Sequence, residues 1–148
     1  MTKSLQELSD RLEIQDLLVD YSYAVDRQQW DALDGVFTPD ATIDLRATGG
    51  VRGDLATVKA FLAKARRHFT ASQHLVATSK IELAGDVATG RTICHNPLAI
   101  KGGPVMFVGL WYLDRFVRTD GGWRIADRAQ ELAFFHNAPP GIAGPATE

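Results

Sequence analysis

The chain has 148 residues, of which 45% are hydrophobic and 23% charged, and these shares are typical of one ordinary globular domain. Sixteen basic and eighteen acidic residues leave a formal charge of -2, which excludes the basic surface of a nucleic-acid-binding protein and a polybasic membrane patch. The single cysteine, Cys94, excludes a disulfide scaffold and a zinc site built from paired cysteines. No apolar run approaches the roughly 20 residues that span a membrane. We therefore expect a cytoplasmic protein without membrane contact.

The first half of the chain predicts three helices and a short strand, in the order helix 4–25, helix 28–36, strand 42–47 and helix 55–68. Ser4 and Glu7 form the pattern of a capping box at the start of the first helix. Pro39 ends the second helix, because proline disfavours helical angles at the residue before it. Asp54 is a suitable N-cap for the third helix.

The second half predicts four long strands joined by short turns that contain glycine, at 72–83, 87–100, 105–118 and 123–135. Strands in this order favour an antiparallel meander. Helices followed by antiparallel strands predict one α+β domain over 1–148, with a curved antiparallel sheet wrapped around the N-terminal helices as a cone. A pocket is expected at the open end of the cone. The Pro- and Gly-rich tail from about residue 137 is expected to be extended.

Four side chains are candidates for chemistry, although each also has a purely structural interpretation. His74 and His95 both fall inside predicted strands, where a histidine is commonly a core residue, and neither has the spacing of a metal ligand. Asp26 ends the first helix roughly 120° around the axis from Ile14, which predicts an acid in solvent. Tyr21 lies on the apolar stripe of the same helix, where its hydroxyl needs a partner. No metal site is predicted.

The order of several short motifs resembles the SnoaL-like proteins of the nuclear-transport-factor-2-like superfamily. The resemblance extends from about Leu8 to Phe135, and the motifs that carry it are Tyr21-x4-Asp26, 28–33, 37–41, Gln73-His74, 88–91, 112–118 and 120–125. The superfamily contains dehydratases, isomerases, dehydrochlorinases and modules without activity. The resemblance therefore implies the fold more strongly than the reaction.

Within that superfamily the chain is most similar to scytalone dehydratase, bile-acid 7-alpha-dehydratase and hexachlorocyclohexane dehydrochlorinase. Those enzymes carry an aspartate at the end of the first helix and a histidine early in the second long strand, and the matching positions are Asp26 and His74. Tyr21 matches a tyrosine of the bile-acid enzyme, and His95 matches a second pocket histidine of scytalone dehydratase. The two tyrosines that hold water in scytalone dehydratase fall on Val25 and Leu45, which argues against scytalone as the substrate.

The resemblance thus implies a lyase or isomerase without a cofactor, acting on a small hydrophobic molecule such as a ring ketone or a hydroxylated polycycle. His74 would be the general base, Asp26 would orient it, and either Tyr21 or His95 would donate a hydrogen bond to the developing negative charge. An apolar wall is expected from five side chains: Trp30, Phe37, Phe107, Leu110 and Tyr112.

Two other functions remain open. The chain could be a binding module without turnover, or the small accessory subunit of a ring-hydroxylating dioxygenase, since both occur with this fold. Residues 105–118 are apolar on both faces, and only one face can line a pocket. The other face would leave an apolar patch that needs a partner. We therefore predict a homodimer or an oligomer built from dimers.

Overall fold

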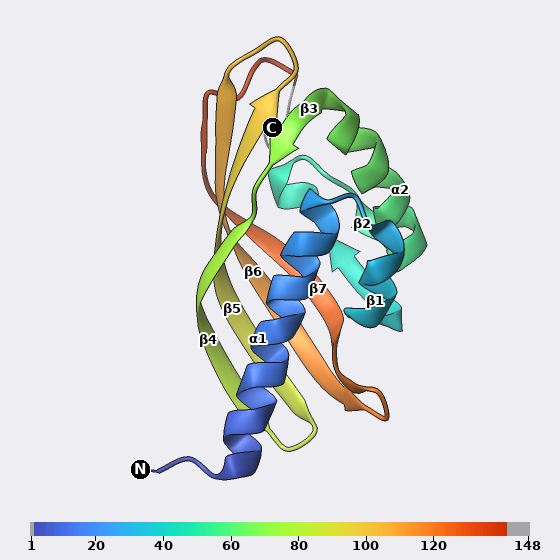
Figure 1. Cartoon of the computed structure of the whole chain (residues 1–148), viewed down its shortest axis with the longest axis vertical. Helices are drawn as coiled ribbons and strands as arrows, with labels where there is room; N and C mark the ends of the chain where they lie inside the picture. The colour runs from blue at the N-terminus through green and yellow to red at the C-terminus, as the bar shows by residue number, and fades with distance from the viewer. Residues whose placement is uncertain (1, 142–148) are drawn as a thin grey trace.

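A computed structural model describes residues 2–141 as a strongly curved sheet with helices packed on one of its sides (Figure 1). The elements in chain order are α1 (Leu5–Asp26), the 3-10 turn η1 (Trp30–Gly35), β1 (Phe37–Asp44), η2 (Arg46–Thr48), β2 (Arg52–Gly53), α2 (Leu55–Ala65), η3 (Arg66–His68), β3 (Phe69–Ser72), β4 (Leu75–Ala84), β5 (Val87–Ile100), β6 (Val105–Thr119) and β7 (Gly122–His136). This arrangement confirms the predicted α+β fold. None of the helices in the described range is long and apolar enough to cross a membrane.

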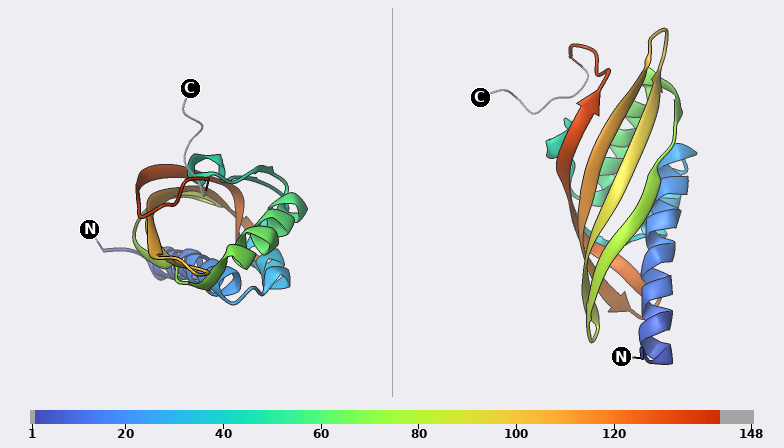
Figure 2. Two further views of the ribbon diagram at one scale, coloured as in Figure 1. Left: turned by 90° about the horizontal axis from the view of Figure 1, so that it is seen from above. Right: turned by 90° about the vertical axis from the view of Figure 1, so that its left-hand side faces the viewer.

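The seven strands follow the order β2-β1-β7-β6-β5-β3, and β4 pairs with another part of β5. Seen from above, the sheet curls through most of a ring that α1 and α2 complete on the remaining side (Figure 2). The meander of β5, β6 and β7 forms as expected, and the expected caps hold both helices. The Ser4 hydroxyl accepts the N–H of Glu7 at 3.1 Å, and the Asp54 carboxylate accepts that of Thr57 at 2.8 Å.

The structure corrects two details of the predicted sheet. Strand β1 begins at Phe37 rather than at residue 42 and runs parallel to β7, so the sheet is not wholly antiparallel. Pro39 is tolerated there because the register shifts between Phe37 and Thr42, which leaves the proline outside the regular ladder. The expected strand over 72–83 is divided into β3 and β4, and the division leaves Gln73 and His74 outside both strands.

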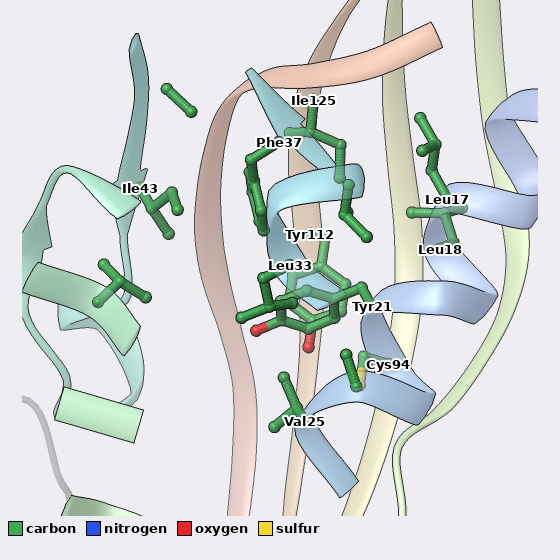
Figure 3. Packing of buried hydrophobic residues seen from close by; sticks show 14 of the residues in the cluster. Leu17, Leu18, Tyr21, Val25, Leu33, Phe37, Ile43, Cys94, Tyr112 and Ile125 are labelled. Atoms are coloured by element: carbon green, nitrogen blue, oxygen red, sulfur yellow. The ribbon is translucent and has the colours of Figure 1, made fainter. Parts of the chain in front are cut away.

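The inner face of the sheet and the buried face of α1 form one apolar core. On β6 the inner side chains Val108, Leu110 and Tyr112 are buried, whereas Phe107 and Trp111 on the outer face are only partly covered. Figure 3 shows side chains of α1 packing directly against those of the sheet, Tyr21 beside Tyr112 among them. This packing fixes α1, and therefore its last residue, against the sheet.

The end of the fold near the N-terminus is fastened by a buried carboxylate. Asp10 accepts two hydrogen bonds from the Arg118 guanidinium, at 2.8 and 2.9 Å, and one from the indole N–H of Trp123 at 2.9 Å. These donors, with Arg118 first, hold the pKa of Asp10 far below its ordinary value. The polar groups at this end are therefore paired among themselves, and the cavity described next lies at the other end of α1.

Candidate active site

Asp26 and His74, far apart in the sequence, meet where α1 ends. Oδ1 of Asp26 lies 2.6 Å from Nδ1 of His74, and the backbone N–H of His74 donates to Oδ2 of the same carboxylate at 2.8 Å. The break between β3 and β4 frees this backbone N–H from the sheet. The side chains are 9% exposed for His74 and 19% for Asp26. The predicted pair therefore exists, and the solvent-exposed Asp26 that the helical wheel indicated is wrong.

Two further side chains complete a hydrogen-bonded network around the pair. The Ser72 hydroxyl donates to Oδ1 of Asp26 at 2.9 Å and lies 3.4 Å from Oδ1 of Asn96. The amide nitrogen of Asn96 lies 3.1 Å from Nε2 of His74. Because a carboxylate only accepts, Nδ1 of His74 carries the proton, and Nε2 is left with its lone pair and the Asn96 amide as its donor.

This network keeps Asp26 ionised. Burial raises the pKa of the carboxyl group, but hydrogen bonds from the side chain and backbone of His74 and from Ser72 act against it, and the pKa lies below its ordinary value. A carboxylate fixed at Nδ1 orients the imidazole ring and stabilises the imidazolium that forms when Nε2 takes a proton. Nε2 of His74 is therefore the nitrogen that can act as a general base.

His74 borders a cavity of about 410 Å³ inside the cone. A cavity of this size holds one small molecule. Of the predicted site residues, Tyr21, Leu110 and Tyr112 also line the cavity. Three expected wall residues do not: Phe37 is buried behind Tyr21, Phe107 is on the outer face of β6, and Trp30 lies in η1.

Behind the tyrosines lies a buried ion pair that sequence reasoning missed. Arg128 donates to both carboxylate oxygens of Asp114, at 2.7 and 2.8 Å, and both side chains are 0% exposed. The guanidinium carbon lies 3.9 Å from the ring centre of Tyr112 and 4.3 Å from that of Tyr21. Burial opposes the charge on Arg128, but Asp114 outweighs it and raises the pKa of the guanidinium. A permanent cation therefore stands against the two tyrosine rings.

The tyrosine hydroxyls remain protonated beside this cation. Burial raises the pKa of Tyr21, and it raises the pKa of Tyr112 well above the ordinary value, while the nearby Arg128 acts in the opposite direction more weakly. A protonated phenol is a hydrogen-bond donor, and both residues line the cavity. They can therefore donate to a negatively charged oxygen that forms there.

Comparison with known proteins places this geometry in a family. Residues 6–129 match the family model described as a SnoaL-like domain. The chain belongs to the SnoaL-like family. This SnoaL-like protein is 47% identical over 133 residues to an uncharacterised protein of Mycobacterium tuberculosis, a match that covers 88% of this chain and 90% of that protein.

Two further likenesses concern enzymes by name. Hexachlorocyclohexane dehydrochlorinase 1 of Sphingobium indicum is 27% identical over 151 residues, covering 93% of this chain and 94% of that protein. A crystal structure from Novosphingobium aromaticivorans, described as a scytalone dehydratase, superposes with a TM-score of 0.81 at 19% identity and covers 95% of each chain. The second likeness shows the shared fold alone.

His95, one of the four candidates for chemistry, also lies outside the cavity of this SnoaL-like domain. Its ring stacks on Phe107 with centroids 5.6 Å apart, on the outer face of β5, and it does not line the cavity. It borders instead an outer hollow that also reaches Asp26 and His74. Of the two side chains expected as alternatives at the cavity, Tyr21 lines it and His95 does not. Neighbouring strand residues point to opposite faces, and Asn96 takes the inner position.

Other chemistries find less support in the described residues. Burial raises the pKa of the Cys94 thiol to about 11, so it is not a thiolate at neutral pH. Within residues 2–141, no group of three or more His, Cys, Asp or Glu side chains is placed to hold a metal ion. The candidate site consists of the pair Asp26–His74, its network and the two tyrosines.

Proposed function

We propose that this protein is a lyase or isomerase that removes a proton from a carbon atom of a small hydrophobic substrate, using the acid–base chemistry of its own side chains. The observation that carries the proposal is the 2.6 Å contact between Asp26 and Nδ1 of His74 at the wall of a cavity. An imidazole with Nδ1 held in this way presents Nε2 as the base.

In the proposed step a substrate C–H group replaces the Asn96 amide at Nε2 of His74. Nε2 takes the proton, and the electron pair of the broken C–H bond moves into the substrate. In a lyase this pair forms a double bond as a leaving group departs from the neighbouring carbon with its own bond pair. In an isomerase it moves toward a carbonyl, and the proton returns at another carbon.

Negative charge develops on the substrate in either reaction. Tyr21 lines the cavity, and its hydroxyl retains its proton because burial raises its pKa. Arg128 supports the same region with a buried positive charge 4.3 Å from the Tyr21 ring centre. Donors and charges that are fixed before the reaction stabilise such a transition state without reorganising. The named activity of the Sphingobium relative, removal of hydrogen chloride from a chlorinated ring, supports the same reaction class.

Deuterium exchange tests the proton transfer without knowledge of the natural substrate. The α-hydrogens of 2-tetralone, a bicyclic ketone, are followed by NMR in D2O with and without the protein. We expect the wild type to accelerate exchange and both Asp26→Asn and His74→Ala to lose about 100-fold or more of that acceleration. His95→Ala is the matched control, because this histidine lies outside the cavity and should retain the rate.

The binding-module alternative rests on one observation. Nε2 of His74 already has a hydrogen-bond partner in Asn96, so the network is complete without a substrate. A binding module would bind the ketone without accelerating its exchange. Acceleration that is equal in the wild type and His74→Ala would contradict the catalytic proposal as well.

A further inference from the structure

Arg66 is a buried cation at the wall of the cavity. The residue is 8% exposed, and its Nε and Nη1 atoms are buried with no hydrogen-bond partner among the residues that the structure describes. No carboxylate within residues 2–141 forms an ion pair with it. Arg66 follows α2 directly and lines the cavity that His74 borders. Buried guanidinium N–H groups normally donate hydrogen bonds, so these two donors without an acceptor need an explanation.

The charged side chains among the described lining residues all have one sign. Lys64 lines the cavity beside Arg66, and no aspartate or glutamate is among the described lining residues. The neighbouring Asp26 borders the outer hollow rather than this cavity. The remaining wall near Arg66 is largely apolar, with Phe61, Leu62 and Phe69. Such a cavity favours a ligand with an apolar body and a negative charge.

The position of Arg66 at the end of α2 offers a simpler explanation for a cation, because positive charge is favourable at a helix C-terminus. Arg67, the next residue, satisfies the same preference while its side chain remains exposed to solvent. The helix dipole therefore explains a basic residue here. It does not explain why Arg66 is buried at a cavity with two nitrogens unpaired, since burial of an unpaired charge is unfavourable.

We propose that Arg66 binds a carboxylate of the substrate, so that the natural substrate is a small apolar acid. The guanidinium matches a carboxylate in charge and in planar donor geometry. The inference deepens the proposed function, because it assumes that the cavity beside His74 is the substrate site. It adds that one end of the molecule is fixed at Arg66 while the reacting carbon lies at His74.

A pair of probes that differ in charge tests this assignment by binding alone. Isothermal titration calorimetry compares 2-naphthoate with its neutral counterpart 2-naphthamide at pH 7. We expect the wild type to bind the acid about tenfold more tightly than the amide, and Arg66→Met to bind the two equally. Arg66→Lys should retain part of the preference. Arg67→Met is the matched control, because it removes the same charge from an exposed neighbour and should retain the full preference.

Two results would overturn the assignment: equal affinity for acid and amide in the wild type, or a preference for the acid that survives in Arg66→Met. The wild-type comparison decides even where Arg66→Met fails to fold. His74→Ala separates this proposal from the catalytic one, because it should lose deuterium exchange and still prefer the acid. Failure of catalysis thus leaves the binding result intact, and failure of the binding result leaves catalysis intact.

Discussion

The amide nitrogen of Asn96 lies 3.1 Å from Nε2 of His74, the ring nitrogen that accepts the substrate's proton in the proposed reaction. The Ser72 hydroxyl lies 3.4 Å from the other end of the amide and 2.9 Å from Asp26. The Asn96 amide is thus bound to Nε2 through one neutral hydrogen bond. Such a bond contributes only about 1 kcal/mol net, so a substrate can displace the amide.

The charge at position 96 should therefore control the base. Asn96→Asp places a carboxylate beside Nε2, and this favours the protonated imidazolium, which cannot accept a proton. We expect the acid limb of the pH–rate profile for deuterium exchange to move up by about one pH unit or more, because a neighbouring opposite charge stabilises the charged form.

Asn96→Leu is the neutral control of similar volume, and its pH profile should stay close to that of the wild type, because Asp26 still holds the ring at Nδ1. An Asn96→Asp profile that coincides with the wild type would contradict the role of Nε2 as the base.

The sequence predicted the parts of this fold that depend on periodicity. The long strands alternate between two faces, and on β6 one of the two apolar sets, Val108, Leu110 and Tyr112, is buried as a group. The sequence did not decide which of the two sets would be the inner one. It was harder to predict from the sequence which residues of β5 face inward. Asn96 pairs directly with Val108 and shares its inner face, whereas His95 pairs with Gly109 and faces outward. A one-residue difference in parity exchanges the two faces.

The candidate site was less predictable because it depends on contacts at irregular positions. Asp26 is the last residue of α1, where the partner is decided by the break between β3 and β4 rather than by the helical stripe. Arg128 and Asp114 carried one usable signal, a charged residue at an inward position of each strand. Only the register, which pairs these two residues directly, shows that the charges compensate each other.

Removing one partner of the buried Asp114–Arg128 ion pair should destabilise the fold strongly, whereas replacing both partners by apolar residues should not. Asp114→Ala leaves Arg128 buried and uncompensated, and we expect a loss of about 3–5 kcal/mol in the free energy of unfolding. The double replacement of Asp114 by Leu and Arg128 by Met restores apolar packing and should recover most of that loss. Urea unfolding of both variants measures the difference.

Activity provides the second measurement on the same variants. The double variant should fold without accelerating deuterium exchange, because the cation beside Tyr21 is gone. Wild-type exchange in the double variant would show that Arg128 supports only the fold.

The hydrogen bonds that Asp10 accepts from Arg118 and Trp123 should make the stability of the protein depend on pH. The pKa of Asp10 is lower in the folded chain than in the unfolded one, so the unfolded chain binds the proton more readily. Its contribution to stability is complete above the unfolded pKa of about 4 and is lost as the pH falls toward the folded pKa.

Asp10→Asn removes this titration. We expect the difference in unfolding free energy between the wild type and Asp10→Asn to be constant from pH 5 to 7 and to shrink below about pH 4. Denaturant unfolding at a series of pH values measures it. A difference that grows at low pH would contradict the assignment.

The outer face of the sheet should hold a second copy of the chain. Ile93 on β5, Val105 on β6 and Phe134 on β7 are each more than 40% exposed on neighbouring strands, and Phe107 and Trp111 lie among them. Contiguous apolar side chains of this kind are unusual on a protein that stays monomeric. We therefore expect a homodimer at micromolar concentration, measured by sedimentation.

Substitutions at two exposed positions distinguish a specific dimer interface from nonspecific association. Ile93→Lys places a charge on the outer face of β5, where the side chain is 42% exposed, so it should dissociate the dimer without unfolding the chain. Val19→Lys is the matched control, because Val19 is 44% exposed on α1, away from that face, and should leave the dimer intact. A wild-type monomer of 16.2 kDa at micromolar concentration would contradict self-association. It would instead favour the accessory-subunit alternative, in which the same apolar face binds a different protein chain.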